Sequence, residues 1–364
     1  MTDAEAAPLR AWARLRRNRL AMASMVLLAL MALACGFGPL LLPHAYDRVF
    51  PDYVKVAPAL AAHPVQAELD AALERISARL HARITARSLT GDVLHLTLEA
   101  PRPLDERLLA YFQRSDLFGT AQVVERQDDG RQLVVNVPLR YETFVFGTDG
   151  NGRDLLTRSL VAGRVSLAVG LLASGVALLI GVAYGAVAGF VGGRIDAVMM
   201  RLVDVLYALP FIFFVILLVV FFGRHFALVF AAIGAIEWLD MARIVRGQTL
   251  SLKRQEFVEA AQALGATTPR VLLHHIIPNL ATPVIVYLTL LVPKIILVES
   301  FLSFLGLGIQ EPLTSWGMLI AEGTRNIQGA PFLLIVPAGF LMLTLFALNF
   351  VGDGLRDAFD PKDR

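Results

Sequence analysis

Six long apolar segments are the feature that most restricts how this chain of 364 residues can fold. A helix needs about 20 mostly apolar residues to cross the hydrocarbon core of a bilayer. The six segments are 20–42, 165–191, 202–222, 226–245, 282–305 and 332–351. The fourth is the weakest, because Glu237 and Asp240 interrupt it. The pattern predicts an all-α polytopic membrane protein with six transmembrane helices.

The bulk composition agrees with a membrane location. Hydrophobic residues make up 56% of the chain and charged residues 18%, which is too apolar for a soluble domain of this size. A net charge of +2 is too small to indicate nucleic-acid binding. The single cysteine, Cys35, excludes an intramolecular disulfide and a cysteine-based metal site. The first apolar segment is longer than a signal-peptide core, so we predict that it is retained.

The positions of arginine and lysine predict the orientation of the chain, because short cytoplasmic loops carry an excess of both. With the N-terminus in the cytoplasm, residues 1–19, 246–279 and 353–364 place most of these cations on that side. The opposite short loops hold only Arg224 and Arg325. Both termini are therefore expected in the cytoplasm.

Residues 43–145 form a polar insertion between the first two predicted spans, on the extracytoplasmic side. Apolar residues at helical spacing predict a helix over 64–87. Alternation and turn residues predict three strands, at 92–99, 121–126 and 132–138. The insertion is expected to be a small α+β domain. Four histidines are too scattered to predict a metal site there: His44, His63, His81 and His95.

A polar stretch, FVEAAQALGATTPRVLLHHIIPN at 257–279, separates the fourth and fifth apolar segments on the cytoplasmic side. Phe257, Ala261 and Leu264 recur at helical spacing and predict one apolar face. Gly265 is placed to end this helix, because glycine adopts a left-handed conformation at little cost.

A second short helix should follow in the same stretch. Thr268 is predicted as its N-cap and Pro269 as its first helical residue. Pro278 is expected to break that helix just before the fifth span. The result would be a short helix parallel to the membrane surface, which a cytoplasmic partner could push.

Five residues of this stretch resemble the EAA signature of permease subunits in binding-protein-dependent ABC importers. They are Glu259, Ala260, Ala261, Gly265 and Pro278. Two further stretches resemble the dipeptide/oligopeptide/nickel branch of that family: FGTDGNGRDLLTRSLVAGRVSLAVG at 146–170 and ESFLSFLGLGIQEPLTSWGMLI at 299–320. The first contains the predicted outer-face residues Gly147, Thr148, Asp149, Gly152, Arg153 and Asp154.

The resemblance implies a type I ABC importer permease fold, with residues 246–279 as a coupling loop within a permease core at 146–352. It implies four partners in the inner membrane or beside it: a second, homologous permease subunit, two ATPase subunits and an extracytoplasmic solute-binding protein. The cargo would be a short peptide, with nickel chelates or other small solutes as alternatives. An ion-coupled carrier or channel is the alternative from another class.

This chain is not expected to hydrolyse ATP, since a phosphate-binding P-loop needs a lysine after glycine-rich backbone. No lysine of the chain follows a glycine; the four are Lys55, Lys253, Lys294 and Lys362. We therefore expect a non-catalytic subunit that binds no cofactor or metal, with ATP and Mg²⁺ on the partner ATPase.

Charged residues inside the apolar segments are candidates for the translocation path or for ion pairs, because such charges rarely face lipid. The candidates are Glu237, Asp240, Lys294 and Glu299. Lys294 is predicted to pair with Glu299 or Glu237. Two further pairs, at a spacing of three residues, are predicted within single helices: Asp240 with Arg243 and Arg201 with Asp204.

Overall fold

A computed structural model describes residues 12–223 and 226–359. The ends of both predicted cytoplasmic tails, together with Arg224 and Lys362, lie outside the described residues. The chain divides into two compact units. The helical unit comprises the chain up to Leu41, Ser159–Asn326 and the chain from Leu334 on. The sheet unit comprises Leu42–Arg158 and Ile327–Leu333.

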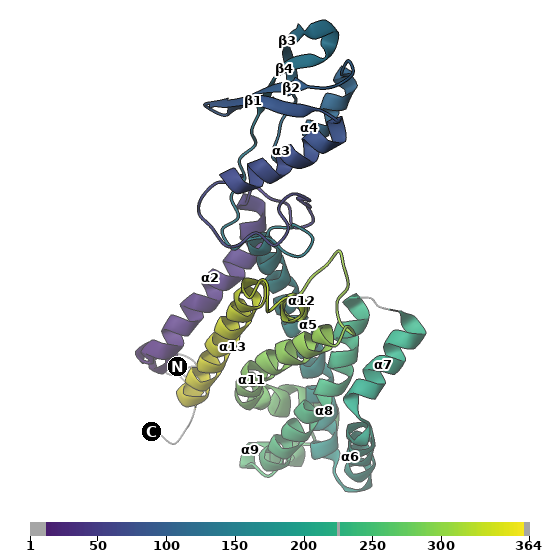
Figure 1. The fold of residues 1–364 in the computed structure, drawn as a ribbon. Helices are drawn as coiled ribbons and strands as arrows, with labels where there is room; N and C mark the ends of the chain where they lie inside the picture. Colours follow the sequence, from purple (N-terminus) through teal and green to yellow (C-terminus); the bar gives the residue numbers. More distant parts are fainter. Residues whose placement is uncertain (1–11, 224–225, 360–364) are drawn as a thin grey trace. The chain divides into compact units, whose positions relative to one another are not determined.

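The helical unit is built from long helices and a few short ones (Figure 1). Helices α5 and α13 lie mainly in this unit, but their first few residues belong to the sheet unit. In chain order the elements are α2 (Arg19–Leu41), α5 (Leu155–Val191), α6 (Gly193–Ala208), α7 (Phe211–Phe222), α8 (Phe226–Leu252), α9 (Glu256–Ala263), α10 (Thr268–Val271), the π-helical turn η3 (Leu272–Ile276), α11 (Ile277–Phe304), α12 (Trp316–Arg325) and α13 (Phe332–Phe359).

Among the described residues, four helical runs are long and apolar enough to cross a membrane: Arg19–Leu41, Leu155–Val191, Thr268–Phe304 and Phe332–Phe359. They overlap the first, second, fifth and sixth predicted spans. The pair α6 and α7 also passes if it is counted as one broken span, bent by 79°. The described chain therefore holds four or five candidate spans, where the sequence predicts six.

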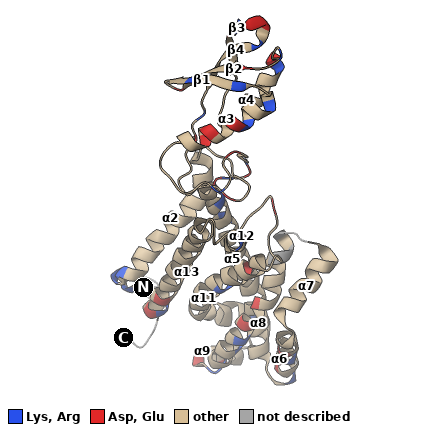
Figure 2. Ribbon diagram, viewed as in Figure 1, with Lys and Arg blue, Asp and Glu red and all other residues tan. Residues whose placement is uncertain are grey.

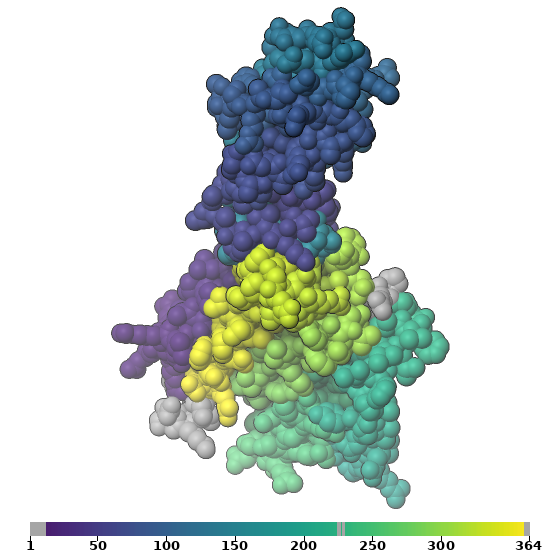
Figure 3. Space-filling view, in the orientation of Figure 1, coloured from purple at the N-terminus to yellow at the C-terminus, as the bar shows by residue number. Residues whose placement is uncertain are grey.

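The continuous helix predicted at 202–222 is wrong. Helix α6 ends at Ala208 and α7 starts at Phe211. Pro210 causes the break, because it lacks a backbone N–H and forces the preceding residue out of the helical conformation. Leu209 accordingly has an extended ψ of 127°. The space-filling view places the side chains of α6 and α7 at the surface of the helical unit (Figure 3).

Helix α8 corresponds to the weak fourth segment and extends seven residues beyond its predicted end, to Leu252. It packs closely on α5 through three glycines of that helix. A methyl group at Gly181, Gly185 or Gly189 would collide with backbone carbonyls or side chains of α8. Small residues bring helix backbones together in this way where no aqueous hydrophobic effect drives association.

The sheet unit contains one four-stranded antiparallel sheet of order β1-β2-β4-β3, with α3 (Gln66–Leu80) on one face (Figure 1). The strands are β1 (Arg83–Thr90), β2 (Val93–Glu99), β3 (Gln122–Gln127) and β4 (Gln132–Pro138). Three short helical turns join them: η1 (Glu106–Leu109), α4 (Ala110–Gln113) and η2 (Asp128–Gly130). Charged residues are frequent on this unit and sparse along α7 and α11 (Figure 2).

The helix predicted at 64–87 is wrong in its last seven residues, 81–87. Helix α3 ends at Leu80, and His81 adopts a left-handed conformation with φ of 50°. Residues from Arg83 onwards form β1, which pairs with β2 along its whole length. The β-branched residues of the β1 sequence RITARSLT suit this strand, and the long-range pairing overrides the helical pattern. The other three predicted strands are confirmed to within one or two residues.

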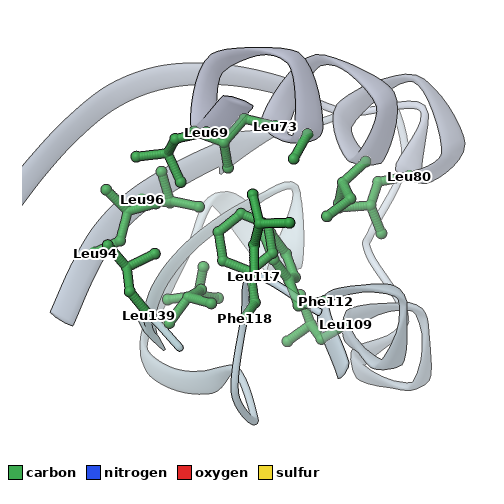
Figure 4. Close-up of a cluster of buried hydrophobic side chains, with 14 of the residues drawn as sticks. Leu69, Leu73, Leu80, Leu94, Leu96, Leu109, Phe112, Leu117, Phe118 and Leu139 are labelled. Atoms are coloured by element: carbon green, nitrogen blue, oxygen red, sulfur yellow. The ribbon is translucent and has the colours of Figure 1, made fainter. Parts of the chain in front are cut away.

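The core of the sheet unit lies between the sheet and α3 (Figure 4). Alternate residues of the two central strands point into it, as the two-residue period of a strand requires. These residues are Leu94, Leu96, Leu98, Leu133, Val135 and Val137. Leu69 and Leu73 of α3 cover them, and Phe112, Leu117 and Phe118 close the core.

Replacing Leu96 by alanine should destabilise the sheet unit by about 2–5 kcal/mol, because Leu96 is 1% exposed and its loss leaves a cavity. The matched control is Leu89→Ala on β1, where the side chain is 51% exposed and the cost should be about 0.5 kcal/mol. Resistance of residues 43–145 to protease, measured on the full chain in detergent during heating, reports the difference. Equal losses in both variants would contradict this core.

Candidate functional site

The predicted coupling loop contains two short helices, α9 and α10, which a tight turn at Gly265 joins. Gly265 ends α9 as predicted, with φ of +84°. Its N–H donates to the carbonyl of Gln262 (2.9 Å), and that of Ala266 donates to Ala261 (3.1 Å). This pair of bonds is the Schellman motif, which satisfies the last carbonyls of a helix and needs a left-handed residue.

Helix α9 buries Val258 rather than the whole of its predicted apolar face. Val258 is fully buried and Ala261 half-buried, whereas Phe257 is 42% and Leu264 89% exposed. Val258 belongs to the same core as Val271 and Ile276, which fixes the rotation of the helix. Phe257 and Leu264 of the predicted apolar face lie exposed, as Glu259 and Ala260 do.

The second helix of the segment does not stop at Pro278, so the predicted break is wrong. Residues Thr268–Phe304 form one run through the π-helical turn η3, and Pro278 lies in the first turn of α11. A π-turn changes the hydrogen-bond register and accommodates the missing N–H of proline. The Asn279 side chain donates to the carbonyl of His275 (2.6 Å). The N-cap is Thr267 rather than Thr268, and its side chain makes no capping bond.

The GTDGNGRD motif is a buried turn organised by Asp149, which is 1% exposed. Its Oδ1 atom accepts from the backbone N–H groups of Asn151 (2.8 Å) and Arg153 (2.9 Å). Its Oδ2 atom pairs with the Arg153 guanidinium (2.7 Å) and with that of Arg158. Arg158 was not predicted as part of this site, although it stands at helical spacing after Asp154.

Two glycines let this turn lie against residues 50–56. Gly147 and Gly152 both have φ of +79°, and a side chain at Gly152 would overlap the carbonyl of Phe50. The Thr148 hydroxyl accepts from the N–H of Val56 (2.9 Å). The motif therefore packs the start of α5 against the beginning of the insertion. Helix α5 begins directly after this motif, at Leu155.

His44 lies between two carboxylates of the sheet unit and is 1% exposed. Its Nδ1 atom is 2.8 Å from Oδ2 of Asp154, and its Nε2 atom is 3.0 Å from Oε2 of Glu142. The hydrogen bond to Asp154 raises the pKa of the imidazole above its ordinary value, against the opposing effect of burial. Arg48 also faces this cluster, 3.6 Å from Glu142.

Lys294 of α11 bridges two carboxylates of α8. Its Nζ atom is 2.8 Å from Oε2 of Glu237 and 2.9 Å from Oδ2 of Asp240. Of its two predicted partners, the structure pairs it with Glu237 and not with Glu299. The predicted pairs within single helices are wrong, because Arg243 of α8 reaches across to Asp204 of α6 (2.9 Å).

Glu299 is fully buried and is held by serine hydroxyls. The hydroxyl of Ser303 donates to its Oε1 atom (2.7 Å), and that of Ser166 on α5 donates to Oε2 (3.1 Å). The carboxylate thus joins α11 to α5. The serines of the stretch at 299–320 explain why a buried carboxylate is tolerated there, since buried polar groups need hydrogen-bond partners.

Trp316 locks α12 onto α5 in the same region. The indole is fully buried and donates to the carbonyl of Ser159 (3.0 Å). A side chain at Gly163 would collide with the indole and with Cys35 of α2. Helix α12 was not predicted, although Ser315 before an apolar run is an N-cap signal. The Ser315 hydroxyl accepts a hydrogen bond from the backbone N–H of Met318 (3.3 Å).

No cluster of three or more histidine, cysteine, aspartate or glutamate side chains suited to a metal ion occurs among the described residues.

Comparison with known proteins decides the family. The family described as "Binding-protein-dependent transport system inner membrane component" matches residues 181–364, and "N-terminal TM domain of oligopeptide transport permease C" matches residues 9–62. The chain belongs to the binding-protein-dependent permease family. It is therefore a multi-pass inner-membrane protein and a non-catalytic component of a transporter whose other parts include an ATPase and a binding protein.

Several relatives align with this permease over about 60% of its length. The Escherichia coli K12 oligopeptide transport system permease protein OppC is 62% identical over 219 residues, which are 60% of this chain and 72% of the relative. The Bacillus subtilis dipeptide permease DppC is 49% identical over 60% of this chain and 69% of its own length. The Escherichia coli O6 glutathione permease GsiD is 41% identical over 60% and 72%.

Among solved structures, the inward-facing MetNI methionine ABC transporter aligns with 56% of this chain and 96% of its own. The TM-score is 0.48 at 15% identity, too weak a likeness to carry an argument.

The His44 cluster should make the stability of the sheet unit depend on pH. Because the folded pKa is raised, the stabilisation is complete below the unfolded value of about 6.5 and is lost as pH rises through the folded value. The difference in Tm between wild type and His44→Gln should therefore be largest at pH 5.5 and shrink above neutrality. Thermal unfolding of the full chain across pH measures it.

The matched control is His81→Asn, an exposed site whose left-handed backbone asparagine tolerates. It replaces a histidine outside the cluster, so its Tm at each pH is the reference for His44→Gln. If His44→Gln lowers Tm equally at every pH, a charged His44 between the two carboxylates is ruled out.

Proposed function

We propose that this chain is the permease subunit of an ABC importer that moves short peptides into the cytoplasm. The observation that carries the proposal is 62% identity to an oligopeptide permease over 72% of that relative's length. The folded coupling segment supports it, because α9 presents an exposed face between two long helices. Identity to the glutathione permease is lower, at 41%.

In the membrane, six spans place both termini in the cytoplasm. The broken pair α6 and α7 serves as the third span and α8 as the fourth. The domains are the cytoplasmic tail at 1–19, the first span at 20–42, the extracytoplasmic insertion at 43–145, the permease core at 146–352 and the cytoplasmic tail at 353–364. The charge bias of the short loops supports this orientation.

The coupling mechanism follows from the exposed face of α9. Phe257 and Leu264 supply apolar contact to a cytoplasmic ATPase subunit, and Ala260 allows close approach. Glu259 supplies a charge at the same surface. ATP and Mg²⁺ bind the ATPase pair, whose closure pulls this segment. Because Val258 and the run Thr268–Phe304 join α9 to the core, the helices move with it as rigid elements.

The complete importer would contain a second, homologous permease subunit, two ATPase subunits and an extracytoplasmic binding protein. The path lies between the two permeases, which alternate between inward and outward opening. Nickel chelates and other small solutes are alternative cargoes. Ligands that copurify with the partner binding protein would discriminate them. Solute flux through this chain alone in liposomes, driven by an ion gradient, would instead select an ion-coupled carrier or channel.

Glu259→Lys should uncouple ATP hydrolysis from uptake while leaving the subunit inserted, because it reverses a charge on the exposed face of α9. The control is Gln262→Lys, which adds a lysine at another exposed position of the same helix. Cargo-stimulated ATPase activity and peptide uptake by the reconstituted importer give the coupling ratio. We expect a drop of about tenfold for Glu259→Lys, the effect of losing one charged contact. Wild-type coupling in this variant would defeat the assignment of the segment.

The sheet unit is proposed to dock the binding protein. Replacing Gln66–Pro138 by a two-residue linker is geometrically allowed, because His63 and Glu142 pair in an antiparallel bridge that holds the ends together. The shortened permease should still assemble and support basal ATPase activity, while its affinity for the loaded binding protein falls at least several-fold. Transport rate against binding-protein concentration measures this. Unchanged affinity would show that the insertion has another role.

A further inference from the structure

A charged patch lies on the surface of the helical unit where α6, α8 and α11 meet. We define it by five residues: Asp204, Glu237, Asp240, Arg243 and Lys294. The side chain of Lys294 is 47% exposed and that of Asp204 55% exposed in this chain. Charged side chains within membrane-spanning segments face a water-filled path or another subunit rather than lipid. The patch is therefore not a lipid-facing surface.

The patch has a surplus of negative charge. It holds three carboxylates and two cations, so its formal charge is −1. Glu237 is 7% exposed, and its Oε2 atom receives no hydrogen bond of acceptable geometry among the described residues, although Lys294 Nζ lies 2.8 Å away. A buried carboxylate oxygen whose neighbouring ammonium is poorly aligned is incompletely satisfied, so a better-aligned donor would bind there more favourably.

The chemistry of such a better-aligned donor is indicated by the ammonium already present. The Lys294 side chain ends in a primary ammonium with three N–H donors. It sits between Glu237 and Asp240 at 2.8 and 2.9 Å, which shows that the two carboxylates are spaced to hold such a group. The α-ammonium of a peptide is the same chemical group. The surplus charge favours a cation over the carboxylate end of the peptide.

We propose that the charged patch lines the translocation path and that Glu237 and Asp240 bind the α-ammonium of a peptide in transit, with Lys294 as the resident ammonium that it displaces. This inference rests on the proposed peptide-import function. The permease would then recognise the peptide itself, in addition to the selection made by the binding protein. The other candidate occupant is a cation of the second permease subunit, which the tests below separate.

The first test uses two tripeptides that differ only in a free or an acetylated N-terminus, each preloaded on the binding protein at saturating concentration. Asp240→Asn should lower the ratio of their transport rates about tenfold, the effect of one charge-assisted hydrogen bond. Lys294→Met should keep or raise the ratio, because it leaves both carboxylates available. The control is Asp196→Asn, which removes another α6–α8 ion pair, with Arg246 at 2.6 Å, and should leave the ratio unchanged.

A purely structural ion pair predicts that Asp240→Asn and Lys294→Met impair transport of both peptides alike. That result, or an unchanged ratio in Asp240→Asn, would overturn the proposal. If the wild-type importer moves neither peptide, the proposed function fails instead. If it moves both and the variants behave as a structural pair, only the ammonium site fails.

The second test does not depend on the binding protein's own selectivity. In a chain with Cys35→Ser, Lys294→Cys provides the single thiol of this permease, whose labelling is read on this subunit after the importer's chains are separated. A water-soluble cationic thiol reagent should label it at least tenfold faster than an anionic one of the same size, and transported peptide should slow the labelling. No labelling by either reagent would mean that the second permease subunit covers the patch, and the proposal would fail.

Discussion

The absence of water in the bilayer core is the constraint on which the rest of this structure depends. Polar groups there must be satisfied within the protein. The chain meets this requirement in two ways around α11. Glu299 is enclosed by serine hydroxyls and ties α11 to α5, whereas Lys294 is held by carboxylates of α8. One helix is thus fixed to two neighbours by polar contacts at different heights.

The same constraint explains what could and could not be predicted. Local signals were sufficient for the first, second, fifth and sixth apolar spans and for Gly265, whose left-handed conformation follows from the residue type. Contacts between distant residues were not accessible. The partner of Lys294 depends on how α8 rotates against α11, and that rotation depends on glycines of α5. For the same reason, Arg243 pairs with Asp204 of α6 and not with Asp240 of its own helix, α8.

The errors in helix boundaries have a related origin. At 81–90 the helical pattern gave way to pairing with β2, a gain that only the assembled sheet provides. At Pro278 the helix continues where the sequence predicts an end, because the π-helical turn just before it accommodates the proline. At Pro210 no such turn formed and the helix bent by 79°. Proline alone therefore does not determine whether a helix ends; the neighbouring hydrogen bonds do.

The proposed coupling segment shows how local structure could make a rigid element that transmits movement. A flexible loop would absorb a push from a partner, but the Schellman turn at Gly265 and the buried Val258 fix α9 to the core. The unbroken run from Thr268 to Phe304 then carries any displacement of the segment along α11. Lys294 lies on that same helix, 26 residues beyond its start at Thr268. A movement of α9 would therefore shift Lys294 against Glu237 and Asp240, which links the proposed coupling surface to the charged patch through one rigid element.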